Sequence, residues 1–192
     1  LKPGAGNTAY KIDGTALWTA PTTVTNGYNA VADFDADGKP EVVVVSAGKL
    51  WVLEGATGAI ELGPLTLPST GEGGPPTVAD FDGDGKREIG VAQQAKYAMV
   101  KPNYATKKID VVWTAPNHDL SSSVTGSSVF DFDGDGTAEV VYNDECYMRV
   151  YAGADGKVIY QVPNPSATIH EYPVVADVDG DGLIGYAAVT RE

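Results

Sequence analysis

Four short stretches of the sequence carry aspartates at every second position, followed by a glycine and, in three of the four, by a glutamate. The clearest stretch reads VFDFDGDGTAEVVY and contains Asp131, Asp133, Asp135 and Glu139. Two carboxylates about 4 Å apart repel each other by about 1 kcal/mol even in water, so this crowding is reasonable where a cation lies between them. Hard oxygen ligands without Cys or His favour a hard cation, and calcium is the first candidate.

The spacing within each stretch is typical of a short calcium loop. The aspartates occupy positions 1, 3 and 5, a glycine at position 6 permits a sharp turn, and position 7 can offer its backbone carbonyl. An EF-hand closes with a glutamate at position 12 and lies between helices, whereas these loops close at position 9 and their flanks are rich in strand-forming residues. We therefore predict calcium loops between strands at residues 33–41, 80–88, 131–139 and 177–185. The predicted ligands are Asp33, Asp35, Asp37, Lys39 and Glu41 in loop one; Asp80, Asp82, Asp84, Lys86 and Glu88 in loop two; Asp131, Asp133, Asp135, Thr137 and Glu139 in loop three; and Asp177, Asp179, Asp181 and Leu183 in loop four.

Loop four departs from the pattern, because Gly185 stands where the other loops have their closing glutamate. A simpler interpretation of any single stretch is a turn rich in Asp and Gly whose charges are solvated. That interpretation does not explain four copies in register. We therefore expect three to four bound calcium ions, with the weakest site in loop four.

The loops recur with a period that predicts a repeat architecture. Their first aspartates are Asp33, Asp80, Asp131 and Asp177, so the steps are 47, 51 and 46 residues. Periods of this size are typical of propellers and other repeat arrays. In each unit a short apolar strand enters the loop, a β-branched strand leaves it, and two further strands follow with Gly-rich turns. The sequence therefore predicts an all-β protein, a β-propeller of four-stranded blades with about four blades present.

The DxDxDGxxE stretches resemble the FG-GAP or VCBS type of repeat, which is also found in the β-propellers of integrin α-subunits. The resemblance covers nearly the whole chain, is complete in three loops and is broken at Gly185. It implies that each loop binds calcium between the first and second strands of a blade. It also implies that the usual ligand surface is the face opposite the calcium loops.

The two ends of the sequence resemble parts of a repeat unit. LKPGAGNTAYKIDGTALWTAP at the start is similar to VKPNYATKKIDVVWTAP in the middle, so the chain is expected to begin late in the third strand of one blade and to end after the second strand of another. The chain, one domain over residues 1–192, then forms either a closed four-bladed ring or an arc of a larger propeller. The absence of an initiating Met, the start within a blade and the larger blade number of related propellers favour the arc and a processed or partial chain.

The net charge of −13 follows mainly from the loops. They contain 15 of the 26 acidic residues, so the remaining 11 acids are matched by 13 basic residues. Nucleic-acid binding is disfavoured on electrostatic grounds, and no stretch reaches the about 20 apolar residues that span a bilayer. Because calcium modules outside cells bind with Kd of about 10⁻⁴–10⁻³ M, we expect an extracellular, cell-surface or periplasmic protein.

Polar and aromatic residues gather on the links that the repeat places opposite the calcium loops. A rigid scaffold presenting such loops suits a protein or glycan ligand. The candidate ligand residues are Tyr28, Asn29, His118, Asp119, Ser121, Ser122, Asn143, Asp144, Glu145, His170, Glu171 and Tyr172.

Two classes of function remain open. The first is a non-enzymatic binding, adhesion or assembly module, to which further blades or subunits outside this chain would add. The second is the propeller domain of a secreted, lyase-like, polysaccharide-active enzyme. Ser122, His118 and Asp119 could be assembled into a catalytic set, but neighbouring His and Asp on one loop rarely reach triad geometry. A lyase also needs groups that neutralise a uronate carboxylate, and the chain has few arginines for this, namely Arg87, Arg149 and Arg191. The sequence therefore favours a non-enzymatic protein with no catalytic residues.

Overall fold

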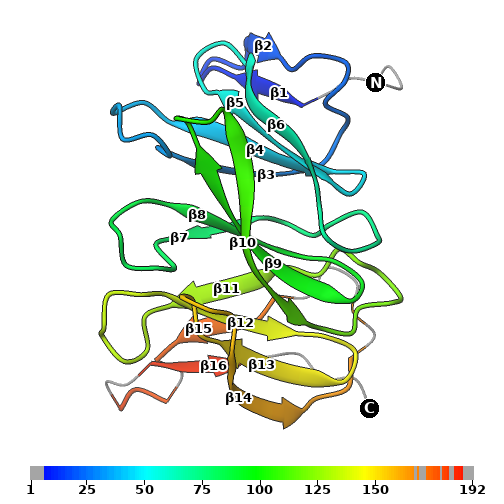
Figure 1. Cartoon of the computed structure of the whole chain (residues 1–192), viewed down its shortest axis with the longest axis vertical. Helices are drawn as coiled ribbons and strands as arrows, with labels where there is room; N and C mark the ends of the chain where they lie inside the picture. The colour runs from blue at the N-terminus through cyan, green and yellow to red at the C-terminus, as the bar shows by residue number, and fades with distance from the viewer. Residues whose placement is uncertain (1–6, 167, 169–171, 178, 182–183, 188–192) are drawn as a thin grey trace.

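The structure, a computed structural model, describes residues 7–166, 168, 172–177, 179–181 and 184–187, and these residues form β-strands and no helix (Figure 1). The all-β prediction is thereby confirmed. The strands are β1 (Thr8–Tyr10), β2 (Ala16–Thr19), β3 (Tyr28–Ala32), β4 (Glu41–Ser46), β5 (Lys49–Glu54), β6 (Ile60–Thr66), β7 (Thr77–Ala79), β8 (Glu88–Ala92), β9 (Lys96–Asn103), β10 (Lys108–Pro116), β11 (Ser127–Phe130), β12 (Glu139–Asn143), β13 (Tyr147–Tyr151), β14 (Val158–Pro163), β15 (Val174–Ala176) and β16 (Gly185–Ala187).

Consecutive strands form antiparallel sheets with a simple up-and-down order. Strands β3–β6, β7–β10 and β11–β14 make three four-stranded sheets, and β1–β2 and β15–β16 make two two-stranded sheets. The second strand of each four-stranded sheet is an almost continuous apolar run, as in VVVV of β4. Such a run is typical of a strand covered on both faces, and β4, β8 and β12 are indeed buried almost throughout.

The hydrophobic core lies between neighbouring sheets. Val43 and Val45 of β4 pack in one cluster with Ile89 and Val91 of β8. A second cluster, which includes Tyr97, joins the sheet of β7–β10 to that of β11–β14. The sheets therefore stack face to face through their middle strands, and each buries apolar area against the next.

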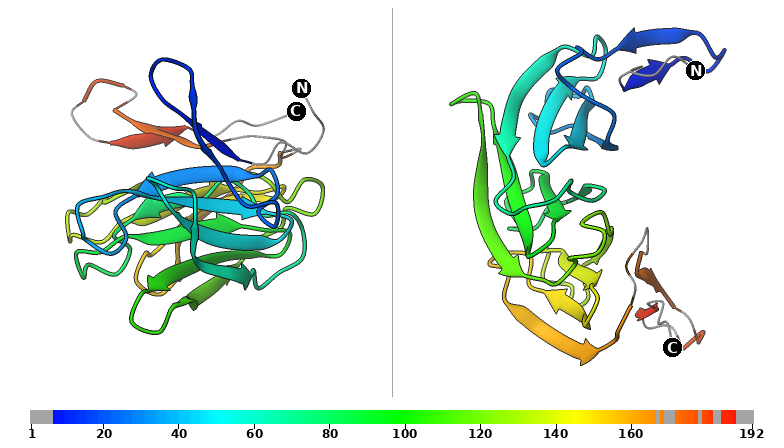
Figure 2. Two further views of the ribbon diagram at one scale, coloured as in Figure 1. Left: turned by 90° about the horizontal axis from the view of Figure 1, so that it is seen from above. Right: turned by 90° about the vertical axis from the view of Figure 1, so that its right-hand side faces the viewer.

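The stacked sheets follow an open arc (Figure 2). Strands β3, β7, β11 and β15 are neighbours from sheet to sheet, whereas β10 and β14 lie on the convex side. Within the described residues, β1–β2 and β15–β16 are separate sheets with no hydrogen-bonded pairing between them. The closed four-bladed ring, in which these strands share one blade, is therefore not found. Among the described residues, no helix that could cross a membrane is present.

Two tryptophans fasten neighbouring sheets together. Trp113 of β10 donates a hydrogen bond from Nε1 to the Gly153 carbonyl, 2.6 Å away, and its ring lies against Gly156. Trp18 of β2 makes the same contacts with Gly55, at 2.8 Å, and with Gly58. Because a Cβ on Gly58 or Gly156 would lie 2.4 Å from the indole, and both glycines have a positive φ, only glycine fits these turns.

Candidate metal centres

Each aspartate-rich loop connects the first strand of a unit to the second. The loops join β3 to β4, β7 to β8, β11 to β12 and β15 to β16, and they lie on one side of the stack (left in Figure 1). Each loop is held at both ends, because one strand ends directly before the first aspartate and the next strand begins at the closing position. The sheet scaffold therefore presents the acidic groups at a common edge.

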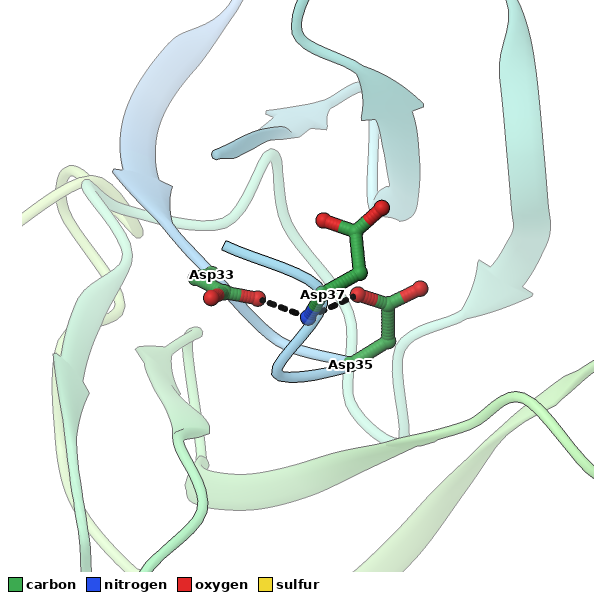
Figure 3. Close-up of side chains that lie close together, drawn as sticks. All are labelled: Asp33, Asp35 and Asp37. Atoms are coloured by element: carbon green, nitrogen blue, oxygen red, sulfur yellow. Dashed lines mark hydrogen bonds between the residues drawn. The ribbon is translucent and has the colours of Figure 1, made fainter. Parts of the chain in front are cut away.

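The aspartate at position 1 folds the loop by accepting backbone hydrogen bonds. The amide of the position-6 glycine donates to Asp33, Asp80 and Asp131 at 2.9, 2.8 and 3.0 Å. In loop one, the amide of Asp37 also donates to Asp33 and Asp35, at 3.2 and 3.1 Å (Figure 3). These bonds draw the carboxylates inward, so the loop is preformed.

The glutamate at position 9 is buried beneath the loop. Glu41, Glu88 and Glu139 are 3%, 0% and 5% exposed. One oxygen of each accepts the amide of the phenylalanine that follows the first aspartate, at 2.8, 2.9 and 2.9 Å. Burial raises the pKa of all three carboxyls, this backbone bond lowers it, and the neighbouring aspartates raise it again. A cation in the loop would offset the cost of keeping these groups ionised.

Carboxylate oxygens converge in all four loops. The converging groups are Asp33, Asp35 and Asp37; Asp80, Asp82 and Glu88; Asp131, Asp133 and Glu139; and Asp177, Asp179 and Asp181, with one oxygen of each lying within 4.8 Å of the others. Ligands of one calcium ion, each about 2.4 Å from it, can be at most about 4.8 Å apart. The donor set and its spacing thus fit a hard divalent cation.

Some predicted ligands lie outside these converging groups. Glu41 is not part of the group in loop one. In loop three, Asp135 accepts hydrogen bonds from the amide and hydroxyl of Thr137, at 2.7 and 2.6 Å. The amides of Lys39 and Lys86 make the corresponding bonds to Asp37 and Asp84, at 2.8 and 2.9 Å. The position-7 residues therefore border the cluster, and ligation by their carbonyls stays a prediction; Leu183 lies outside the described residues.

Sequence reasoning missed Lys101, which enters loop two from β9. Its ammonium lies 2.6 Å from Asp82, 2.8 Å from Asp84 and 2.9 Å from Glu88. Although burial lowers the pKa of Lys101, its hydrogen bonds to Asp82 and Asp84 and its close contact with Glu88 raise that pKa above its usual value. Only the pairing register of β8 with β9 reveals this contact, because Lys101 is 13 residues from Glu88 in the chain.

Loop four is expected to bind calcium more weakly than loops one and three. Its three aspartates converge, but Gly185 offers no carboxylate at the closing position, so attraction for the ion is reduced. In a calcium titration followed by calorimetry, Glu139→Ala should weaken loop three to about the affinity of loop four. Equal affinities for loop four and for unaltered loop three would contradict this prediction.

Three residues of the predicted ligand surface are buried and make hydrogen bonds within the fold. Asp119 and Asp144 are completely buried, and Asn143 is 2% exposed. Asp119 accepts hydrogen bonds from the hydroxyls of Ser122 and Thr168, at 2.8 and 2.9 Å. Although burial raises it, these bonds hold the pKa of Asp119 below its usual value. The placement of these three residues on a ligand surface is therefore corrected, because they are buried inside the loops that the sequence analysis treated as exposed.

Asp144 ties three segments of this face together. It accepts the amides of His118, Cys146 and Tyr147, each at 2.8 Å, and pairs with Arg149. His118 is exposed, and its Nε2 lies 3.5 Å from Glu145. Since Ser122 donates to Asp119, and His118 faces Glu145, no Ser–His–Asp relay is assembled in the described part of this face.

Two tyrosines of this face, Tyr28 and Tyr172, are at least partly accessible. Tyr28 borders a hollow of about 300 Å³ together with Asn26, Ser46 and Glu72. Tyr172 is 46% exposed, and its pKa is raised by partial burial and by the nearby Tyr28. Asn29 and Ser121 are exposed as well, whereas His170 and Glu171 lie outside the described residues.

Comparisons with known proteins identify the repeat and the fold. The family described as FG-GAP-like repeat matches residues 33–91 and 131–184, more than half of the chain. The chain is similar to the V. cholerae biofilm matrix protein Bap1, with a TM-score of 0.75 and 18% identity over 96% of this chain and 57% of that chain. It is also similar to rhamnogalacturonan lyase YesW (TM-score 0.67, 20% identity, 96% of this chain and 40% of that one).

A third similar structure is Bacillus licheniformis rhamnogalacturonan lyase PL11 (TM-score 0.53, 19% identity, 95% of this chain and 48% of that one). A comparison with curated protein sequences gave no match. The chain spans 57% of the length of Bap1 and 40% of that of YesW. At such identities the likeness shows a shared fold.

Proposed function

The chain belongs to the FG-GAP-like repeat family, and on that premise we propose that it is a calcium-stabilised β-propeller arc that binds protein or glycan ligands outside the cytoplasm without catalysing a reaction. The stacked four-stranded sheets and the neighbouring first strands support the propeller arrangement. Each four-stranded sheet is then one blade, and residues 1–192 form one domain.

Calcium would be held by the converging carboxylates of the four loops. In loops two and three the ligands would be two aspartates and the buried glutamate, and in loops one and four three aspartates. A bound ion supplies positive charge that offsets the repulsion among these groups. In this proposal the loops take no part in catalysis, and their role is to join the first two strands of each blade.

The kind of site proposed here supports a location outside the cytoplasm. Loops of this type suit the calcium concentrations found outside cells, because extracellular modules bind with Kd of about 10⁻⁴–10⁻³ M. The similar structures include a biofilm matrix protein, Bap1. Both points support a secreted or surface protein that takes part in adhesion or matrix assembly.

One observation favours binding over catalysis: two acidic groups opposite the calcium loops are buried and hydrogen-bonded within the fold. Asp119 and Asp144 are completely buried and accept hydrogen bonds from their own loops. They therefore cannot reach a substrate as bases. Tyr172 is exposed and Tyr28 is half-buried, and both are suited to contacts through aromatic faces and hydroxyls.

An enzymatic role is the second candidate, because two of the similar structures described above are rhamnogalacturonan lyases that share the fold over at least 95% of this chain. In this alternative the chain is the propeller domain of a secreted polysaccharide-active enzyme. His118 with Glu145 is the pair that could act as an exposed base.

We expect the chain to retain a polysaccharide without cleaving it, and the tyrosine pair to carry the contact. The double variant Tyr28→Ala, Tyr172→Ala should weaken binding about tenfold, which corresponds to about 1.4 kcal/mol and to the size of one aromatic contact. The measurement uses immobilised acidic polysaccharides, including rhamnogalacturonan, in the presence of calcium. Tyr10→Ala is the matched control, because Tyr10 is 67% exposed on β1 and is not among the residues that line the hollow beside Tyr28.

The same incubation distinguishes the two candidates. Retention without an unsaturated, ultraviolet-absorbing product supports the binding module. Release of such a product, lost in His118→Ala, would replace it with the lyase. If no polysaccharide is retained or cleaved, the proposed ligand is a protein. The same variant, Tyr28→Ala with Tyr172→Ala, then tests binding of that protein.

A further inference from the structure

We propose that Lys101 is a built-in cation of loop two, so that this loop is partly neutralised without calcium and binds calcium more weakly than loops one and three. The inference rests on the proposed calcium loops and adds a difference between them that the loop motif does not contain. Loop two has the full set of Asp80, Asp82, Asp84 and Glu88. By its motif alone, it should equal loop three.

The ammonium of Lys101 occupies the oxygens that an ion would need. It lies 2.6 Å from Asp82 and 2.9 Å from Glu88, two of the three carboxylates that converge in this loop. The other oxygen of Glu88 already accepts the Phe81 amide, at 2.9 Å. The oxygen facing Lys101 is buried and has no hydrogen bond of ordinary geometry. Calcium must therefore displace the ammonium from Glu88 or share that oxygen with a second cation.

Burial strengthens the attraction between Lys101 and Glu88. The side chain of Glu88 is 0% exposed and that of Lys101 is 25% exposed, so water and salt screen the pair less than a surface pair. The ammonium also contacts Asp84, at 2.8 Å. Lys101 is thus held by carboxylates from both halves of the loop, and it links the loop to the third strand of the same sheet.

The residue level with the closing glutamate, on the third strand of each sheet, carries a different charge in each of the three sheets. In the first sheet Glu41 pairs with Glu54. In the second, Ile89 pairs with Val100, so Lys101 lies level with Glu88. In the third, Val140 pairs with Tyr151, so Ala152 lies level with Glu139. The residue level with the closing glutamate is therefore negative in the first sheet, positive in the second and neutral in the third. Loops two and three give the cleanest comparison, because in both the converging carboxylates are two aspartates and the glutamate.

This difference predicts an order of calcium affinity and a division of roles. Loop three has the uncharged Ala152 at this position, and Glu54 adds negative charge near loop one. Lys39 also pairs with Asp37 in loop one, at 3.1 Å, but both side chains are exposed, so water screens this pair more than that of Lys101 with the buried Glu88. Loop two is the weakest of the three, but it keeps its shape when calcium is scarce because its own lysine joins the strands. The central sheet would then stay folded at calcium concentrations that empty the loops on either side.

The test follows each loop separately in the full chain. The amides of Gly38, Gly85 and Gly136 donate to the first aspartate of loops one, two and three, so their NMR signals report calcium at each loop. In a titration with calcium chloride at constant ionic strength, Gly85 should respond at about tenfold higher calcium than Gly136. This ratio is a modest expectation for one unit charge at such distances.

Two substitutions should move the response in opposite directions. Lys101→Met should bring the Gly85 midpoint to that of Gly136, whereas Ala152→Lys should move the Gly136 midpoint to about tenfold higher calcium. Lys96→Met removes the same charge from the far end of β9, where Lys96 pairs with Pro116, and should change neither midpoint. If one variant fails to fold, the other still decides the result.

The outcomes separate this inference from calcium binding itself. Equal midpoints at Gly85 and Gly136 in the natural chain, unchanged by Lys101→Met, would overturn the role of Lys101 and leave the calcium loops intact. The absence of a response at all three glycines would overturn calcium binding and this inference with it. A selective shift of Gly85 in Lys101→Met would establish the built-in cation.

Discussion

Removal of calcium is expected to lower the thermal midpoint of this chain by about 15–30 °C. An ion that binds only the folded chain stabilises it by about 2.7 kcal/mol per site when its concentration is a hundred times the Kd. Three independent sites then contribute about 8 kcal/mol, and each kcal/mol moves the midpoint of a chain of this size by about 2–4 °C. The measurement is a thermal melt followed by circular dichroism, with excess calcium and with a chelator.

The control for this prediction separates a specific ion from general screening. Magnesium at the same concentration should raise the midpoint much less, because it keeps its waters and demands a tighter octahedral site. Sodium chloride at matched ionic strength should have a small effect, since it only screens the repulsion among the carboxylates. Identical midpoints with calcium and with chelator would show that the loops are turns with solvated charges.

The local part of the candidate site could be predicted from the sequence. The alternation of aspartates, the glycine at position 6 and the strand-forming flanks all act within about ten residues. The structure accordingly places every loop between the first two strands of a unit. The converging carboxylates of Asp131, Asp133 and Glu139 follow from the same spacing.

The parts that could not be predicted depend on contacts between distant segments. Lys101 reaches loop two only because of the register between β8 and β9. Asp119 is completely buried and accepts a hydrogen bond from Thr168, 49 residues away. A single sequence contains no signal for such pairs, so both residues were misjudged: Lys101 was overlooked, and Asp119 was treated as exposed.

The arrangement of whole sheets was predictable only in part. The similarity of the segments around Trp18 and Trp113 indicated repeated strands, and the structure places both tryptophans in equivalent contacts with the next sheet. Closure of the ring could not be decided from these segments, because it depends on the angle between successive sheets. That angle is set by packing in the interfaces, such as the one around Tyr97.

Replacement of Trp113 by alanine is expected to destabilise the fold by about 3–5 kcal/mol, the usual cost of removing a large buried aromatic side chain. The indole is 8% exposed, stacks on Tyr97 with ring centroids 5.9 Å apart and covers Gly156, which has no side chain of its own to fill the space. Its loss would open a cavity between two sheets and leave the Gly153 carbonyl without its donor. Urea unfolding in saturating calcium measures the change.

Trp113→Phe separates packing from hydrogen bonding in this interface. Phenylalanine keeps an aromatic ring near Tyr97 but cannot donate to Gly153, so most of its smaller cost, about 1 kcal/mol, would come from the lost hydrogen bond. Trp18→Ala should cost less than Trp113→Ala, because Trp18 is only partly buried in its equivalent contact with Gly58. A loss below about 1 kcal/mol in Trp113→Ala, at unchanged m-value, would mean that the sheets are joined mainly through their middle strands and that the tryptophan contact is incidental.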